Sequence, residues 1–218
     1  MAASRLKGKP LLEINNVPII CHVLNKAKET GLEAIVATED KEIVAAIEQN
    51  GGGKVILTGN HKTGTDRIFE AFKKLKIKNV DYILNLQGDE PMIDPKDIIN
   101  LNKLMIKNNS DIGTLASEIK KDTMLTNENI VKVITEKKLE NNNFVKALNF
   151  LRKGLKKENS NIYHHIGIYC YKVSVLEKFI NLDQTKNEIK NRLEQLRALD
   201  NNIKINVALA ESSPIGVD

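Results

Sequence analysis

The sequence predicts an α/β protein with a doubly wound, mostly parallel sheet and a small antiparallel extension. Two observations carry this prediction. Through the first half of the 218-residue chain, short apolar runs alternate with amphipathic stretches of helical spacing. Beyond about residue 111 the apolar runs follow one another with little helix between them, which indicates antiparallel strands over about residues 120–175. The sequence has no repeat, linker or low-complexity tract, so we expect one domain over residues 1–218.

The elements of the first half follow from their turn residues and apolar spacing. Pro18 favours the first turn of a helix with Ile20, Val23 and Leu24 on one face, and Gly31 ends that helix. The elements expected next are a strand at 34–37, a helix carrying Ile43 and Ile47, a strand at 54–57, a helix from Asp66, a strand at 80–86 and a helix from Pro95.

The second half is expected to be richer in strands. A final helix places Ile189, Leu193, Leu196 and Leu199 on one face, and a last strand follows it. The strands expected in this half cover residues 112–119, 130–134, 144–150, 166–173 and 203–208.

The composition sets the class of protein. Hydrophobic residues make up 41% of the chain and charged residues 28%, as in an ordinary globular protein. No apolar run approaches the roughly 20 residues that a membrane span needs. No signal peptide is expected, because no apolar segment follows the first residues. Cys21 and Cys170 lie within apolar segments, which predicts buried thiols in a reducing compartment, the cytoplasm.

The net charge of +5 raises the question of nucleic-acid binding. The lysines are scattered rather than gathered in one run. Aromatic residues make up only 4% of the chain, with no Trp, so platforms for stacking bases are scarce. We therefore expect neither a nucleic acid nor a membrane as a partner.

The chemistry begins where the run 80–86 ends, in Gln87-Gly88-Asp89-Glu90-Pro91. The carboxyl end of a strand in an open α/β sheet is where ligands bind, and Gly88 lets the backbone pass close to one. A carboxylate in this place suits Mg²⁺, which takes one or two protein carboxylates together with substrate phosphates. The alternative is a polar turn with a solvated Asp-Glu pair.

Six segments and the last three residues, in this order, carry a family resemblance. They are Ser4-Arg5-Leu6-Lys7-Gly8-Lys9-Pro10-Leu11, Val36-Ala37-Thr38-Glu39-Asp40, His61-Lys62-Thr63-Gly64-Thr65-Asp66-Arg67, Asn85 to Pro91, His165-Ile166-Gly167-Ile168-Tyr169, Glu194-Gln195-Leu196-Arg197 and Gly216-Val217-Asp218. Together they resemble the 3-deoxy-manno-octulosonate cytidylyltransferase family, over nearly the whole chain. The fold that this resemblance implies is of the nucleotide-diphospho-sugar transferase type.

The resemblance also implies a reaction. CTP and 3-deoxy-D-manno-octulosonate (Kdo) would give CMP-Kdo and pyrophosphate with Mg²⁺ as cofactor, for lipopolysaccharide biosynthesis, and the protein would be a homodimer. The attack of a sugar hydroxyl on the α-phosphate needs charge neutralisation and in-line positioning rather than covalent work by the protein. Asp89 and Asp218 would bind the metal, and with Lys9 they would form the catalytic set.

The remaining site residues are carried over in the same way. Arg5 and Lys9 would hold the triphosphate. On the nucleotide side the resemblance implies Ser4, Arg5, Lys9, Thr38, Asp40 and Arg67, and on the sugar side Gln87, Arg152, His165, Tyr169, Glu194 and Gln195. Two alternatives stay open: Thr65 and Asp66 as a helix cap and first-turn acid, and His165 as a satisfied structural group.

The chain also departs from the family pattern. The family strand that ends in Ile-Pro-Ala-Arg before the first loop and the helix that follows Asp218 are absent, Lys7 replaces a proline, and Leu151 replaces a serine. We therefore expect a chain clipped at both ends, weakly active or inactive as given. The alternatives are a cytidylyltransferase for another acidic sugar, such as a sialic acid, and a non-catalytic nucleotide-binding remnant.

Overall fold

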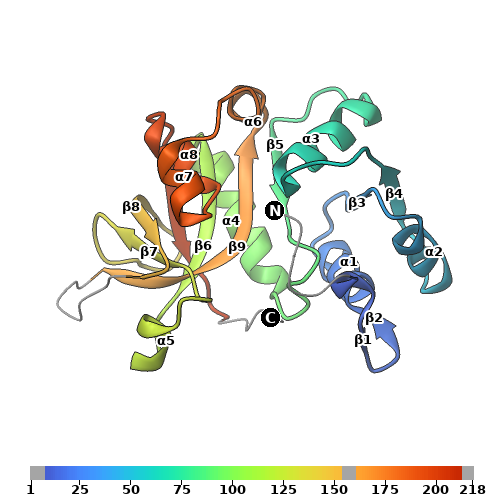
Figure 1. Cartoon of the computed structure of the whole chain (residues 1–218), viewed down its shortest axis with the longest axis horizontal. Helices are drawn as coiled ribbons and strands as arrows, with labels where there is room; N and C mark the ends of the chain where they lie inside the picture. Colours follow the sequence, from blue (N-terminus) through green and yellow to red (C-terminus); the bar gives the residue numbers. More distant parts are fainter. Residues whose placement is uncertain (1–7, 154–160, 213–218) are drawn as a thin grey trace. The chain divides into compact units, whose positions relative to one another are not determined.

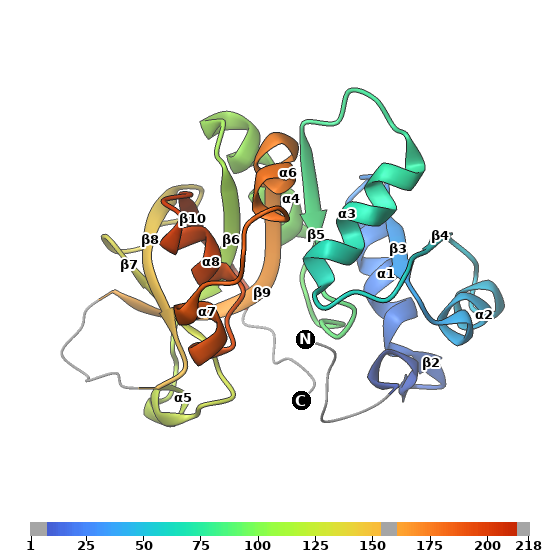
Figure 2. The ribbon, with the colours of Figure 1, turned by 45° about the horizontal axis from the view of Figure 1, so that its top comes forward.

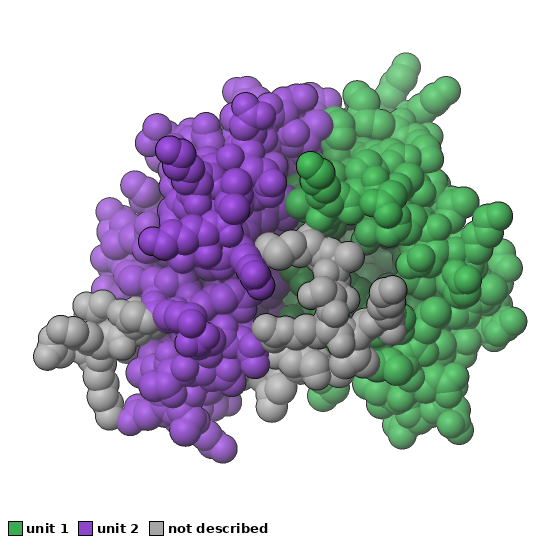
Figure 3. Space-filling model, viewed as in Figure 1, with its two compact units in different colours: residues 1–80, 85–98, 214–218 green, residues 81–84, 99–213 purple. Residues whose placement is uncertain are grey.

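The structure is a computed structural model that describes residues 8–153 and 161–212. The chain divides into two compact units (Figure 3). Among the described residues, unit 1 holds 8–80 and 85–98, and unit 2 holds 81–84, 99–153 and 161–212. The expectation of one domain over residues 1–218 stays a prediction.

Unit 1 contains a two-stranded parallel sheet covered by helices. β3 pairs with β4 from Ile35 opposite Lys54 to Thr38 opposite Leu57. A buried cluster of Ile20, Cys21, Leu24, Ile43 and Ile47 packs against side chains of these strands. The elements of this unit are η1 (Lys9–Leu11), β1 (Glu13–Ile14), β2 (Val17–Pro18), α1 (Ile19–Glu29), β3 (Ile35–Thr38), α2 (Lys41–Gln49), β4 (Lys54–Leu57) and α3 (Gly64–Leu75).

Unit 2 is built on a six-stranded sheet in the order β5-β9-β6-β10-β8-β7. β10 is parallel to β6, while β6 with β9, β10 with β8, and β7 with β8 are antiparallel. Its elements are β5 (Tyr82–Asn85), α4 (Pro95–Asn108), β6 (Ile112–Ser117), α5 (Asp122–Thr126), β7 (Lys132–Thr135), β8 (Phe144–Leu151), β9 (Ile162–Lys172), α6 (Val173–Phe179), α7 (Lys186–Asn191), α8 (Gln195–Asp200) and β10 (Ile205–Leu209). Asn85 and the first residues of α4 fall within unit 1.

β9 is the longest strand of unit 2 and the one that joins its sheet into a closed arrangement (Figure 1). It pairs with β6 and also with β7, at the other end of the strand order, so that five strands close on themselves. A register shift between Thr114 and Leu115 interrupts the pairing of β6 with β9, and the part of β9 beyond it, at 162–164, pairs with β7. The predicted α/β class and the antiparallel strands after residue 111 are confirmed.

The predicted final helix is wrong as a single element. Arg192 adopts φ 54, which ends α7, and α8 begins at Gln195. Ile189 is 60% exposed whereas Leu196 is 1% exposed, so the two do not share one buried face. α7 and α8 instead lie side by side (Figures 1 and 2). The hairpin β1–β2, α5 and α6 were not predicted from the sequence.

Both cysteines are free and buried, one in each unit, as predicted. Burial raises the pKa of the Cys21 thiol, and it raises the pKa of Cys170 to about 12. Among the described residues no helix has the length and apolar character needed to cross a membrane.

Candidate active site

The polar turn after β5 and the loop ahead of α1 meet within unit 1. Gly8, at φ 80, begins η1, and the Leu11 N–H donates to its carbonyl at 2.8 Å. This turn holds Lys9, which is 9% exposed, with its Nζ 3.0 Å from Oδ2 of Asp89. The structure therefore brings together two residues of the predicted catalytic set that lie 80 positions apart in the chain.

The turn that carries Asp89 is tightly packed. The Glu90 N–H donates to the Gln87 carbonyl at 3.3 Å, and the Gln87 side chain is exposed. A Cβ on Gly88 would meet Cδ1 of Ile20 in α1 at 3.0 Å. The backbone at Gly88 thus passes close to α1, and its approach to a ligand stays a prediction.

The second cluster of unit 1 lies at the end of β3. Thr38 is buried, and its Oγ1 accepts the Asp40 N–H at 3.1 Å, which sets the turn into α2. Arg67 of α3 places Nη2 3.5 Å from Oε1 of Glu39, a residue that the sequence reasoning did not select. The Arg67 Nε is buried and makes no hydrogen bond with any described residue. The Arg67 guanidinium pairs with Glu39 through Nη2, so its Nε–H remains available to another hydrogen-bond acceptor.

The start of α3 gives the helix cap that the sequence left open. The cap is Thr63, whose Oγ1 accepts the Asp66 N–H at 3.1 Å, and Thr65 is not the capping residue. Asp66 is the acid of the first turn, as the alternative held.

The loop that leads to this cap is held by one carboxylate of α3. Glu70 accepts hydrogen bonds from the Gly59 N–H at 3.0 Å and from the Lys74 Nζ at 2.6 Å, and it also contacts Nε2 of His61. The hydrogen bonds from Lys74, His61 and Gly59 lower the pKa of Glu70 to about 2.

His165 lies within the closed sheet of unit 2. It is 8% exposed, and its Nε2 lies 3.0 Å from Oγ1 of Thr114. The Phe150 ring meets the imidazole edge-on at 5.1 Å between centroids, and the Tyr169 ring lies 5.4 Å away. Burial first, then His164 and Arg152, lower the pKa of His165 to about 3, so the imidazole is neutral near pH 7.

Tyr169 extends the same row of rings. It stacks on Tyr171 with centroids 5.9 Å apart, and burial, Tyr171 and Glu194 raise its pKa well above the usual value. The hydroxyl therefore stays protonated and is available as a hydrogen-bond donor.

Arg152 follows β8 and faces a loop of backbone carbonyls. Its Nη1 donates to the carbonyls of Glu128 at 3.3 Å and Asn129 at 3.1 Å. The Arg152 carbonyl in turn accepts a hydrogen bond from Lys132 at 2.9 Å. Lys132 is a buried cation that the sequence reasoning missed, although a lysine inside the apolar run 130–134 was a visible signal.

Glu194 and Gln195 sit at the start of α8, which a buried ion pair fixes. Arg197 donates to both carboxylate oxygens of Glu188, from Nε at 2.9 Å and from Nη2 at 2.6 Å. Its guanidinium lies 4.8 Å from the centre of the Phe179 ring, and its Nη2 lies 3.9 Å from Oε1 of Glu194. The same carboxylate accepts the backbone N–H of Thr185 in the capping box that begins α7.

Three predicted site residues, Ser4, Arg5 and Asp218, lie outside the described residues. The others fall into two groups, each within one unit. Unit 1 carries Lys9, Thr38, Asp40, Arg67, Gln87 and Asp89, and unit 2 carries Arg152, His165, Tyr169, Glu194 and Gln195. Over residues 8–153 and 161–212, no group of three or more His, Cys, Asp or Glu side chains is arranged so that it could hold a metal ion.

A model of the cytidylyltransferase family matches residues 1–205. The chain is 40% identical to the 3-deoxy-manno-octulosonate cytidylyltransferase of Agrobacterium fabrum, over 100% of this chain and 87% of that protein. It is 41% identical to the protein of the same name from Thermodesulfovibrio yellowstonii, over 99% of this chain and 89% of that one.

Solved structures agree. The structure of a CMP:2-keto-3-deoxy-manno-octonic acid synthetase complexed with CTP superposes with a TM-score of 0.85 at 34% identity, covering 99% of this chain and 88% of that one. A 4-diphosphocytidyl-2C-methyl-D-erythritol synthase from Anaerococcus prevotii, at 13% identity and a TM-score of 0.64 over 95% of this chain and 86% of its own, shares the fold alone.

The fold and these matches define a nucleotidyltransferase of the cytidylyltransferase class. Within that class, the chain belongs to the 3-deoxy-manno-octulosonate cytidylyltransferase family.

Proposed function

We propose that this protein transfers CMP from CTP to Kdo, giving CMP-Kdo and pyrophosphate, with Mg²⁺ as its cofactor. The observation that carries the proposal is the match of the whole chain, at about 40% identity, to proteins named for this reaction. The contact of Lys9 with Asp89 supports it chemically, because an ammonium and a carboxylate are the groups that a metal–triphosphate pair engages.

The donor chemistry of Asp89 fits Mg²⁺. Its carboxylate is 34% exposed, and Lys9 contacts Oδ2. Hard oxygen ligands of this type suit the ion, which keeps part of its shell for water and phosphate oxygens. When bound, the ion would neutralise charge on the α-phosphate and lower the pKa of the attacking hydroxyl. Asp218 is proposed as the second protein ligand.

The chain's own residues would do the positioning. Lys9, with Ser4 and Arg5, would bind the triphosphate, and Thr38, Asp40 and Arg67 the cytidine. The buried Nε of Arg67 supports this assignment, because it offers a donor that no described residue uses. Gln87 would bridge toward the sugar.

The second group of residues would hold the sugar acid. Arg152 supplies a cation for its carboxylate, and Tyr169 supplies a hydroxyl donor. Neutral His165 offers a ring nitrogen, although its contact with Thr114 supports the structural alternative equally. Glu194 and Gln195 would accept from the sugar hydroxyls.

The setting of the reaction is part of the proposal. We propose that the enzyme acts in lipopolysaccharide biosynthesis in the cytoplasm, as a homodimer. The free, buried state of both cysteines supports a reducing compartment. Sedimentation of the purified chain tests the dimer.

A substrate panel tests the reaction. The purified chain is incubated with CTP, MgCl₂ and either Kdo or a sialic acid, and both pyrophosphate and the sugar nucleotide are measured. CMP-Kdo formation at a rate well above that with the sialic acid is expected. Faster turnover of the sialic acid would point to another acidic sugar. CTP binding without product from either sugar, both by this chain and by a chain extended at its amino end, would point to a non-catalytic nucleotide-binding protein.

A further inference from the structure

Lys132 is a charged side chain with no access to solvent. It is 0% exposed and stands on β7 between Val131 and Val133. A buried ammonium is costly unless hydrogen bonds satisfy it. Its Nζ donates to the Asn127 carbonyl at 2.5 Å and to the Arg152 carbonyl at 2.9 Å. Both acceptors are backbone atoms, so the side chain holds two chain segments together.

The same two segments are joined a second time from the opposite direction. Arg152 sends its guanidinium to the carbonyls of Glu128 and Asn129, and Lys153 pairs with Glu128 at 2.7 Å. The backbone of Arg152 is thus held by Lys132, while its side chain holds the loop 127–129. Without the bond from Lys132, that arrangement loses its buried anchor.

The position of Lys132 in the sheet explains why it can do this. It stands opposite Leu151 on β8 and opposite His164 on β9, where three strands meet. Arg152 follows Leu151 directly, and His165 follows His164. Burial and then Arg152 lower the pKa of Lys132, and burial and then Lys132 lower that of His164. Lys132 thus stands beside the two positions from which Arg152 and His165, both proposed to bind the sugar, extend.

We propose that Lys132 is a positioning residue for the sugar-acid side of the site, which acts by fixing Arg152 and the loop 127–129 for the substrate carboxylate. The proposal rests on the proposed function. Lys132 does not itself bind the substrate, because it is fully buried and its ammonium is bound to two carbonyls.

The test is a double-mutant cycle on the full chain. Lys132→Met keeps the length of the side chain and removes its hydrogen-bond donors. Arg152→Met removes the guanidinium that Lys132 is proposed to position. With CTP, Mg²⁺ and Kdo, Lys132→Met is expected to raise the KM for Kdo about tenfold, as for a lost orienting hydrogen bond, with the KM for CTP within about twofold. In the Arg152→Met background, Lys132→Met is expected to add little further effect.

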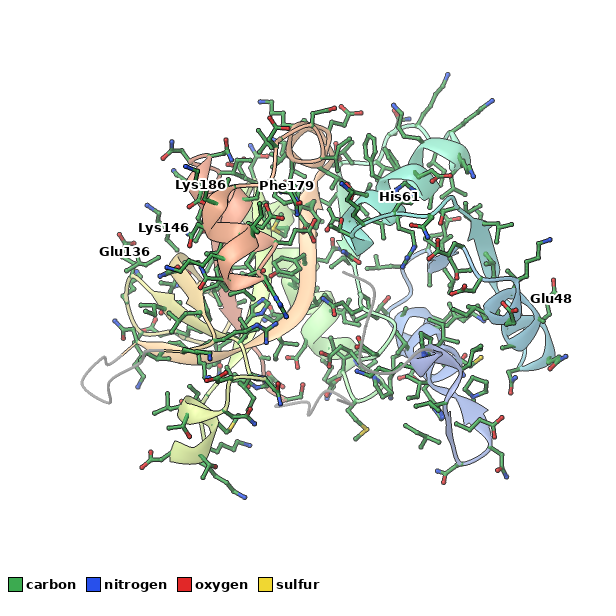
Figure 4. All side chains as sticks on the ribbon, viewed as in Figure 1. Glu48, His61, Glu136, Lys146, Phe179 and Lys186 are labelled. Atoms are coloured by element: carbon green, nitrogen blue, oxygen red, sulfur yellow. The ribbon has the colours of Figure 1, made fainter. Side chains whose placement is uncertain are left out.

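A matched control is Lys146→Met, which removes an exposed lysine from β8 of the same sheet (Figure 4). This variant is expected to leave both KM values unchanged. If Lys132→Met does not fold, as judged by circular dichroism, the cycle is run with Lys132→Arg, which keeps a buried cation but displaces the carbonyls.

The outcomes separate the two proposals. Absence of CMP transfer to Kdo both by the unsubstituted chain and by a chain extended at its amino end overturns the proposed function. An active chain in which Lys132→Met leaves the KM for Kdo unchanged overturns the inference alone. Equal increases in the KM values for Kdo and CTP, or full additivity with Arg152→Met, also overturn it, because they indicate a general structural role.

Discussion

The Nζ of Lys9 lies 3.0 Å from Oδ2 of Asp89, which joins the first loop of the chain to the turn after β5. The pair is asymmetric in exposure, with side chains 11% and 34% exposed. The better-sheltered cation holds a carboxylate that remains open to solvent. This arrangement suits a carboxylate that binds a metal and a cation that binds phosphate.

The first prediction concerns this pair. Asp89→Asn removes the carboxylate charge that is proposed to bind Mg²⁺ and is expected to lower kcat about 100-fold or more. Lys9→Met is expected to raise the KM for CTP about tenfold, since it removes one proposed phosphate contact. Initial rates of pyrophosphate release measure both effects.

The neighbouring carboxylate is the control for this prediction. Glu90→Gln is expected to stay within about twofold of the unsubstituted chain. Chelation of divalent cations is expected to stop the reaction, and added MgCl₂ to restore it. Full activity of Asp89→Asn, or of the chelated enzyme, would contradict the metal assignment.

The second prediction concerns the pH dependence of stability at His165. Its pKa is about 3 in the folded protein against an ordinary 6.5, so below pH 6.5 the unfolded chain takes up a proton that the folded protein does not. The free energy of unfolding therefore falls as the pH drops from 6.5 toward 3, by about 1.4 kcal/mol per pH unit from this residue.

Urea unfolding at pH 7 and pH 4.5 measures that slope. His165→Gln is expected to reduce the loss of stability between these two pH values by about 2–3 kcal/mol. His164, whose pKa burial also lowers, is present in both proteins and cancels in the comparison. Equal slopes for the two proteins would mean that His165 is protonated normally in the fold.

The third prediction concerns the buried ion pair of Glu188 and Arg197. Their side chains are 4% and 5% exposed, so Arg197→Met leaves a carboxylate buried without its cation. The expected loss in the free energy of unfolding is about 3–5 kcal/mol. Glu29→Gln breaks the exposed pair with Lys26 and is expected to cost less than about 1 kcal/mol. Similar losses for both variants in urea unfolding would refute this distinction.

The fourth prediction concerns Gly113 on β6. A Cβ there would lie 2.5 Å from Sδ of Met105 and 2.9 Å from Cζ of Phe144, so Gly113→Ala is expected to cost about 1–3 kcal/mol through overpacking. Gly64→Ala is the matched control, because no atom lies within 4 Å of its Cβ and it stands in α3. Thermal unfolding that ranks Gly64→Ala below Gly113→Ala would show that the packing on β6 is loose.

The sequence predicted the elements best where hydrophobic periodicity decides them. β4 was predicted with its observed bounds, and β8 to within one residue. The final helix failed because periodicity cannot reveal a left-handed residue such as Arg192, whose conformation depends on how α7 and α8 pack. The pairing of β7 with β9, which closes the sheet, could not be predicted from the sequence either, because the paired residues lie far apart in the chain.

The site shows the same division. Two motifs, each continuous in the sequence, selected Lys9 and Asp89, which the structure brings together. Lys132, Glu39 and Glu188 were not predicted as part of the site. Each of them contacts an arginine that lies far from it in the sequence or on another element, and only the fold shows these contacts. An isolated charge within an apolar run was the one signal available, and it applied to Lys132 alone.

Cys21 is buried in unit 1 and Cys170 in unit 2, so each unit carries one thiol whose reaction with a labelling reagent reports the unfolding of that unit. A thiol with a raised pKa and 0–2% exposure resists alkylation until the structure around it opens. Pulsed labelling followed by peptide mass spectrometry can therefore time the unfolding of the two units separately in one unmodified chain. Added CTP should slow labelling at Cys21, in the unit that carries the proposed nucleotide-binding residues.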